Sequence, residues 1–292
     1  MSIFTGSAVA LITPFHDGVV DYQSLTNLVE LQIASGTDAI VALGTTGEAA
    51  TLTPDEREEV IRFIVERVSN RIPVIVGTGS NNTEEAIQKS RFAEAVGADG
   101  LLIVTPFYNK TTQEGLLAHY SSIAEQVRLP IIIYNVPSRT GLNILPETVN
   151  KLVKSCENIV GIKEASGNIE QIVKLAALCP ECDIYSGNDD HVVPILSVGG
   201  KGVISTVANI IPEVMHLMCK AYFDSDVQEA KRLQLALLPL AQAAFCEVNP
   251  IPIKTMMSLL KLCDSEVRLP LVKPSIEHYE LMETTLRENG ML

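Results

Sequence analysis

A lysine stands at the end of an apolar run in the segment VGIKEASGN. Among the twelve lysines of the chain, Lys163 is the one that directly follows such a run, whereas Lys201, the nearest competitor, precedes one. Burial disfavours the charged form of an amine, so we expect part of this amine to be neutral, as a Schiff-base lysine requires. The alternative is a structural ion pair with Glu164, which is disfavoured because successive side chains of a strand point to opposite faces.

Hydroxyl side chains accompany other apolar runs of the chain. Tyr134 lies near the end of the preceding run, IIIYN, where a phenol could carry protons, although packing is the common role of a strand tyrosine. The segment GTTGE contributes Thr45 and Thr46, and TPFYNK contributes Tyr108. Together these residues predict a site in which hydroxyls relay a proton around one lysine.

A cation for an anionic substrate is available in the segment VPSRTG. Arg139 of this segment has a plain alternative role as a solvated surface arginine. The chain, however, carries a formal net charge of -13, so a carboxylate substrate needs a local cation, and a guanidinium binds a carboxylate through two hydrogen bonds. We therefore include Arg139 in the predicted site.

A repeating unit must hold these residues: an apolar run, a small or polar loop, then a segment with helical spacing. Most of the runs are apolar without strict alternation, which fits strands of a parallel sheet that are buried on both faces. Eight such units in roughly 220 residues predict an α/β fold, a TIM barrel, whose reactive residues follow the carboxyl ends of the strands. The predicted strands are Ala8–Thr13, Ala39–Leu43, Val74–Gly77, Gly100–Thr105, Ile131–Asn135, Val160–Lys163, Asp183–Ser186 and Gly202–Ser205.

Helix start signals accompany the amphipathic segments, as in TPDEREEVIRFIVERV, where Thr53 can cap the helix and Glu56 can close a capping box. We predict a TIM barrel over residues 1–224 and a C-terminal helical extension over residues 225–292, packed on the barrel as one structural unit. The segments after the eighth strand that have helical character are Pro212–Phe223, Asp226–Cys246, Ile253–Leu262 and Pro274–Glu288.

Composition excludes several classes of protein. The acidic balance and the absence of a basic run argue against nucleic acid or an anionic membrane surface as a partner. The most apolar long stretch, LQLALLPLAQAAF, is too short for a transmembrane helix, and the N-terminus lacks a positively charged signal region. We therefore expect a cytoplasmic protein.

Cofactor motifs are likewise missing. The five histidines form no ligand spacing, and neither a Gly-x-Gly-x-x-Gly nor a Walker motif is present, so we expect no metal and no organic cofactor. The segment SGNDD is acidic where many barrels bind phosphate, which argues against a phosphorylated substrate. Cys179 and Cys182 form a Cys-x-x-Cys that could be a redox pair or half a zinc site, but a turn after a helix is the favoured interpretation.

The segments GTTGE, YNVPSRTG and GIKEASGN, at the second, fifth and sixth predicted strands, resemble those of the dihydrodipicolinate synthases, also called 4-hydroxy-tetrahydrodipicolinate synthases. TPFYNK, SGND and GVIS extend the resemblance in order over essentially the whole chain. It implies a lyase of the class I aldolase type that condenses pyruvate with aspartate 4-semialdehyde to the cyclic precursor of diaminopimelate and lysine. The family also implies a homodimer or a homotetramer.

The resemblance assigns a role to each candidate residue. Lys163 would form an imine with pyruvate and Tyr134 would exchange the protons. Thr45 would link that tyrosine to Tyr108, which in the family comes from the neighbouring subunit. Substrate contacts would come from the Thr46 hydroxyl on the pyruvate carboxylate, the Arg139 guanidinium on the semialdehyde carboxylate, and Gly187 and the Ile204 backbone lining the pocket.

Alternatives and one departure remain. Sibling aldolases on the same barrel, such as N-acetylneuraminate lyase, share the lysine and tyrosine but usually have Ser-Thr at the Thr45 and Thr46 positions and lack a match to Arg139. If the barrel were only a binding module, we would expect the lysine, the tyrosine or the arginine to be replaced, and none of them is.

Lysine-inhibited members of the family have a serine, two histidines and a tyrosine in the feedback site. This chain has Ala49, Pro54, Arg57 and Phe107 there, although Asn81 and Glu85 remain, so we predict weak or absent inhibition by lysine.

Overall fold

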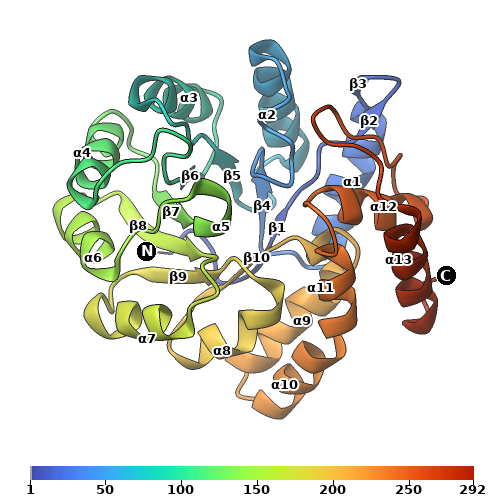
Figure 1. Ribbon diagram of the computed structural model, residues 1–292. Coiled ribbons are helices and arrows are strands. Elements are labelled where there is room, and N and C mark those ends of the chain that lie inside the picture. Colours follow the sequence, from blue (N-terminus) through green and yellow to red (C-terminus); the bar gives the residue numbers. More distant parts are fainter. Residues whose placement is uncertain (1) are drawn as a thin grey trace. The chain divides into compact units, whose positions relative to one another are not determined.

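Eight parallel strands close a barrel in the order β1-β10-β9-β8-β7-β6-β5-β4 in the computed structural model, which describes residues 2–292 (Figure 1). Each of the eight predicted apolar runs coincides with one of these strands and differs from it only at the ends, so the predicted TIM barrel is confirmed. The strands are β1 (Gly6–Ala10), β4 (Ala39–Ala42), β5 (Val74–Gly77), β6 (Gly100–Val104), β7 (Ile131–Asn135), β8 (Ile159–Glu164), β9 (Asp183–Ser186) and β10 (Gly202–Ser205).

Burial on both faces explains the apolar character of these strands. Every residue of β4, β5 and β7 is buried, so alternation between polar and apolar residues has no place in them. The register between β7 and β8 pairs Tyr134 with Lys163 and Asn135 with Glu164. Because side chains alternate along each strand, one pair faces one side of the sheet and the next pair faces the other.

The contacts of the chain divide it into two compact units, and the first comprises residues 2–6 and Pro73–Ile204. In Figure 1 its larger helices flank the outer side of the strands β5 to β9. The short helix α5 (Pro137–Thr140) directly follows β7, and α8 (Val192–Ser197) lies between β9 and β10. The larger helices are α3 (Thr83–Ala95), α4 (Gln113–Ala124), α6 (Pro146–Ser155) and α7 (Ile169–Leu178).

The second unit comprises Ser7–Ile72 and Ser205–Leu292. Its N-terminal part holds a hairpin of β2 (Phe15–His16) and β3 (Val19–Val20), which the sequence analysis did not predict. The division of the chain between residues 224 and 225 stays a prediction. The helices of this unit are α1 (Tyr22–Ala34), α2 (Pro54–Val68), α9 (Pro212–Phe223), α10 (Val227–Ala236), α11 (Leu238–Ala244), α12 (Ile251–Leu259) and α13 (Ile276–Glu288).

One predicted helix is wrong in extent. The segment Asp226–Cys246 forms two helices, α10 and α11, rather than one. Pro239 lies in the first turn of the second helix, where its missing N–H costs nothing, whereas inside a continuous helix it would remove a hydrogen bond. The proline therefore marks a new helix start.

The capping box predicted for residues 53–56 is confirmed. The Thr53 hydroxyl accepts a hydrogen bond from the Glu56 N–H at 3.2 Å, and the Glu56 carboxylate accepts one from the Thr53 N–H at 2.9 Å. Both N–H groups would otherwise lack a partner at the helix start. This cap fixes the beginning of α2.

His119 on α4 makes the stability of the fold depend on pH. Its Nδ1 lies 2.9 Å from the Thr83 hydroxyl, and burial lowers the pKa of the imidazole from 6.5 to about 4. Between these two values the unfolded chain binds a proton that the folded chain does not, so the free energy of unfolding falls as the pH falls. We expect a loss of up to about 3 kcal/mol between pH 7 and pH 4 from this group, at about 1.4 kcal/mol per pKa unit.

Urea titrations of the wild type and of His119→Gln over this pH range measure the effect. Glutamine does not titrate, so the variant should lose less stability between pH 7 and pH 4 than the wild type loses. Parallel curves for the two proteins would contradict the assignment to His119.

Candidate active site

Lys163 and Tyr134 meet at the carboxyl-terminal ends of β8 and β7. The two residues are partners in the parallel register, and both are buried, at 5% and 7% exposure. The Lys163 Nζ lies over the Tyr134 ring, 4.5 Å from its centroid. The predicted amine and phenol are therefore neighbours in a poorly hydrated place at the ends of the two strands.

Glu164 and Asn135, the next residues along the two strands, form a buried polar network on the other side of the sheet. The Glu164 carboxylate accepts hydrogen bonds from Asn135 Nδ2 at 3.0 Å, from the Ser166 N–H at 2.8 Å and from Gln171 Nε2 at 3.2 Å. Asn143 joins the network through Asn135 and Gln171. None of the ion pairs found in residues 2–292 includes Glu164. The donors to its carboxylate are side-chain and backbone amide groups.

This network ties together the strand ends that carry the two candidate side chains, Tyr134 and Lys163. Asn135 and Glu164 bridge β7 and β8 one residue beyond Tyr134 and Lys163. The hydrogen bond between Asn135 and Glu164 therefore sets the distance between the strand ends that carry Tyr134 and Lys163. A displacement of about 1 Å in a reacting group can cost about a hundredfold in rate. The outward-facing pair therefore positions the inward-facing one.

Glu164→Gln is expected to lower kcat about tenfold to a hundredfold. The new amide would replace one carboxylate oxygen by an NH2 group that faces two donors, Asn135 Nδ2 and either the Ser166 N–H or Gln171 Nε2, which disrupts the network while the side-chain shape is kept. The double variant Asn135→Asp and Glu164→Gln exchanges the amide and the carboxylate between the two positions. It should recover part of the kcat that Glu164→Gln loses. Turnover and the extent of imine trapping on Lys163 measure both effects.

Asn158 provides a matched control at the opposite end of β8. Its side-chain amide donates to the carbonyls of Ala124 and Val127, each at 3.0 Å. Asn158→Ala should lose stability like the network variants but keep the wild-type kcat. An equal loss of kcat in both variants would show that general destabilisation, not positioning, is responsible.

The predicted Thr45 and Thr46 lie in the turn after β4, within the second unit. The Thr45 carbonyl accepts from the Glu48 N–H at 3.1 Å, and the Gly47 N–H donates to Gly44 at 3.1 Å. Thr46 is 2% exposed and Thr45 is half-buried. The turn thus holds one hydroxyl deep in the unit and one nearer its surface.

Tyr108 and Arg139 are exposed in the first unit, the former on a loop and the latter on a short helix. Tyr108 is 90% exposed and has a φ of +67°, a backbone conformation that bulky residues seldom adopt. Its neighbour Asn109 anchors the loop by donating to the Asn81 carbonyl at 2.9 Å. Arg139 lies on α5, only five residues after Tyr134, and the left-handed Gly141 ends that helix.

Gly187 directly follows β9, and Ile204 lies within β10. A Cβ on Gly187 would meet the Ala165 Cβ at 2.5 Å, so only glycine allows the loops after β8 and β9 to approach this closely. The Gly187 N–H donates to the Glu164 carbonyl at 2.8 Å, which ties the two loops together. Ile204 is fully buried in β10.

Four buried polar residues beside these candidates were missed from the sequence: Asn135, Glu164, Asn249 and Lys254. The first two could have been found as polar residues next to the reactive ones at strand ends. Lys254 is a single charge in the apolar segment IPIKTMM and could have been flagged as a buried ion. Asn249 carried no sequence signal that we can identify.

Neither metal ligands nor a membrane helix is found in the part of the chain that the structure describes. His, Cys, Asp and Glu nowhere gather in a group of three or more that could hold a metal ion within residues 2–292. No helix there is long and apolar enough to cross a membrane. Cys179 caps the end of α7, and its carbonyl accepts from the Cys182 N–H at 3.0 Å, which is the turn after a helix that the sequence predicted.

Known proteins resemble the chain over its full length. The sequence profile of the Dihydrodipicolinate synthetase family matches residues 3–289. A 4-hydroxy-tetrahydrodipicolinate synthase of Thermoanaerobacter sp. (strain X514) is 52% identical over 293 residues, which cover 100% of this chain and 99% of that protein.

Solved structures of dihydrodipicolinate synthases are similar to the chain in fold and in sequence. Dihydrodipicolinate synthase from Aquifex aeolicus has a TM-score of 0.97 and 44% identity and covers 99% of each chain. The enzyme from Cyanidioschyzon merolae with lysine bound has a TM-score of 0.96 and 38% identity and covers 100% of each chain. These names indicate a lyase of the class I aldolase type and do not favour the sibling N-acetylneuraminate lyase. With a closed parallel barrel and full-length relatives of this identity, the chain belongs to the dihydrodipicolinate synthetase family.

Proposed function

We propose that this protein condenses pyruvate with aspartate 4-semialdehyde through a Schiff base on Lys163. The observation that carries the proposal is the buried amine of Lys163 at the end of β8, placed against the ring of Tyr134. The names of the relatives support the same reaction. The amine attacks the keto carbon of pyruvate, water leaves, and the resulting imine draws electrons from the neighbouring methyl group.

Proton transfer is the task of the hydroxyl groups in this proposal. The imine loses a methyl proton and becomes an enamine, whose carbon attacks the aldehyde carbon of the second substrate. Tyr134 gives and takes these protons, and Thr45 links it to Tyr108, which the family resemblance assigns to the neighbouring subunit. The 90% exposure of Tyr108 is consistent with a partner outside its own chain.

In this proposal different residues bind the two substrates. Thr46 donates to the pyruvate carboxylate, and Gly187 and the backbone of Ile204 line the pocket. Arg139 binds the carboxylate of the semialdehyde, a role that suits a guanidinium in a strongly acidic protein. Because the carboxyl ends of all strands in a parallel barrel share one rim, these loops are suited to form a common site.

Assembly and location complete the proposal. We infer a homodimer or a homotetramer, because Tyr108 needs a second copy of the chain to act in a site. We also propose a cytoplasmic location. Size-exclusion chromatography with light scattering measures the assembly directly.

Borohydride trapping tests the central step. The protein is incubated with pyruvate and sodium borohydride, its intact mass is recorded, and the modified residue is mapped by peptide digestion. A reduced pyruvate adduct on Lys163 supports the imine, after which assays with aspartate 4-semialdehyde and with an uncharged sugar aldehyde identify the second substrate. No adduct, or one on another lysine, would overturn the proposal.

Inhibition by lysine is expected to be weak or absent. In the segments that correspond to the family's feedback site, the Arg57 guanidinium donates to the Ala49 carbonyl at 2.7 Å. Glu85, which remains from the feedback pattern, already accepts from the Ser80 hydroxyl at 2.7 Å and pairs with Lys89. A steady-state assay with added lysine measures the effect, and a sub-millimolar inhibition constant would refute this expectation.

A further inference from the structure

A buried hydrogen bond joins the turn after β4 to the segment before α12. Asn249 Nδ2 lies 2.9 Å from the Thr46 hydroxyl, and the residues are 6% and 2% exposed. The two residues are 203 positions apart in the chain, so the contact exists only in the folded protein. An amide NH2 group can only donate, which means that the Thr46 oxygen accepts and its own proton must point elsewhere.

Within residues 2–292, the acceptor found for the Thr46 proton is a weak one. The Thr206 hydroxyl lies 3.4 Å from the Thr46 oxygen, beyond the usual 2.5–3.0 Å for a hydrogen bond between two hydroxyls. A carboxylate oxygen is a much stronger acceptor than this distant hydroxyl. The bond from Asn249 also polarises the Thr46 O–H and makes it a better donor. The arrangement therefore leaves a hydroxyl proton ready for an anion.

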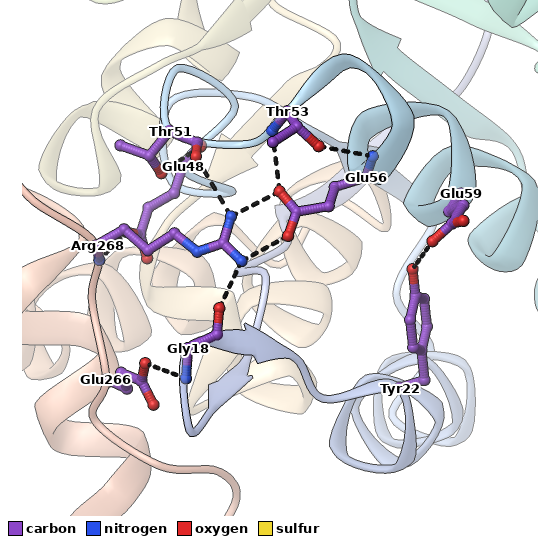
Figure 2. Close-up of polar contacts among 9 residues, drawn as sticks. All are labelled: Gly18, Tyr22, Glu48, Thr51, Thr53, Glu56, Glu59, Glu266 and Arg268. Carbon is purple, nitrogen blue, oxygen red and sulfur yellow. Dashed lines mark hydrogen bonds and ion pairs between the residues drawn. The ribbon is translucent and has the colours of Figure 1, made fainter.

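Buried charges fix the backbone of the same turn. Lys254 on α12 forms an ion pair with Glu48 at 2.5 Å, and the two side chains are 0% and 1% exposed. Glu48 has a φ of +51°, and its carboxylate also accepts from the Arg268 N–H at 3.1 Å. Figure 2 shows the Arg268 guanidinium between the carboxylate of Glu56 and the Gly18 carbonyl. The turn is thus anchored at Thr46 to the segment before α12 and at Glu48 to α12 itself.

We propose that Asn249 is a positioning residue that aims the Thr46 hydroxyl at the pyruvate carboxylate. The inference rests on the proposed function, in which Thr46 binds that carboxylate. In this role Asn249 acts on the substrate through Thr46. The C-terminal helices accordingly serve substrate binding as well as packing.

A double-mutant cycle isolates this role. The variants are Asn249→Ala, Thr46→Val and the pair, and the readout is the pyruvate concentration that gives half-maximal borohydride trapping on Lys163. Asn249→Ala should raise this concentration about tenfold, the size of one hydrogen bond. In the Thr46→Val background the same substitution should change nothing, because the hydroxyl that it orients is gone.

Gln32→Ala is the matched control. Gln32 is also a fully buried amide of the second unit, and it donates to the Ala208 carbonyl at 2.8 Å, so its loss should cost stability without changing the half-maximal concentration. Asn249→Asp is the second variant, to be used if Asn249→Ala fails to fold. It keeps the shape, reverses the hydrogen bond and should raise the concentration only when Thr46 is present.

The outcomes distinguish a failure of the positioning role of Asn249 from a failure of the proposed function. Equal effects of Asn249→Ala with and without the Thr46 hydroxyl, or no effect in either background, would overturn the positioning role while leaving the imine chemistry intact. A wild-type protein that forms no adduct on Lys163 would overturn the proposed function and this inference with it.

Discussion

Lys163→Arg is expected to form no pyruvate adduct and to turn over about a thousandfold or more slowly than the wild type. Arginine keeps the positive charge and the length of the side chain, but its guanidinium stays protonated and cannot attack a ketone. The substitution therefore removes the nucleophile while disturbing the buried strand end as little as a natural residue can. Intact mass after borohydride trapping and the steady-state kcat measure the two effects.

Lys201→Arg is the control for this prediction, because Lys201 stands directly before a barrel strand rather than at the end of one. That variant should trap pyruvate and turn over like the wild type. Thermal unfolding of both variants shows whether the fold survives. Adduct formation by Lys163→Arg would mean that another amine carries the reaction, and the assignment of the site would fail.

Lys254→Met is expected to cost about 3–5 kcal/mol of unfolding free energy, or roughly 10 °C in Tm. The substitution leaves the Glu48 carboxylate buried without the Lys254 ammonium, although the Arg268 N–H still donates to it. Burial already lowers the pKa of Lys254, and Glu48 opposes that shift, so each charge is tolerated inside the unit because of the other. Urea unfolding monitored by circular dichroism measures the loss.

Two further variants test whether the unpaired charge is the cause. Glu48→Gln combined with Lys254→Met removes both charges and should recover most of the stability, since a neutral pair has little desolvation cost. Lys220→Met breaks an exposed pair with Asp224 on α9 and should cost no more than about 0.5 kcal/mol. If the double variant were no more stable than Lys254→Met alone, the lost packing of the side chain would be the better explanation.

The strand that carries Lys163 could be predicted because its signal is local. An apolar run buried on both faces looks the same wherever the rest of the chain lies, and a lysine that follows such a run stands out. The capping box at Thr53 and Glu56 is local in the same way. These features needed no knowledge of the residues that pack against them.

The supports of the site could not be predicted, because their partners are distant in the chain. The contact between Asn249 and Thr46 and the ion pair between Lys254 and Glu48 each join segments more than 200 residues apart. Helical spacing does not show which face of α12 meets which turn. The same limit explains the unpredicted hairpin of β2 and β3, whose two-residue strands are too short to show a period.

The alternation of side chains along β8 has an evolutionary consequence. A shift of one residue in that strand would turn the Lys163 side chain to the face that now carries Glu164, and the Glu164 side chain to the face that now carries Lys163. An insertion or deletion of one residue within this strand therefore changes which side chain faces the site. Relatives of this protein can change substrate through substitutions in the loops at the carboxyl ends of the strands. The register of β8 within the sheet must stay the same.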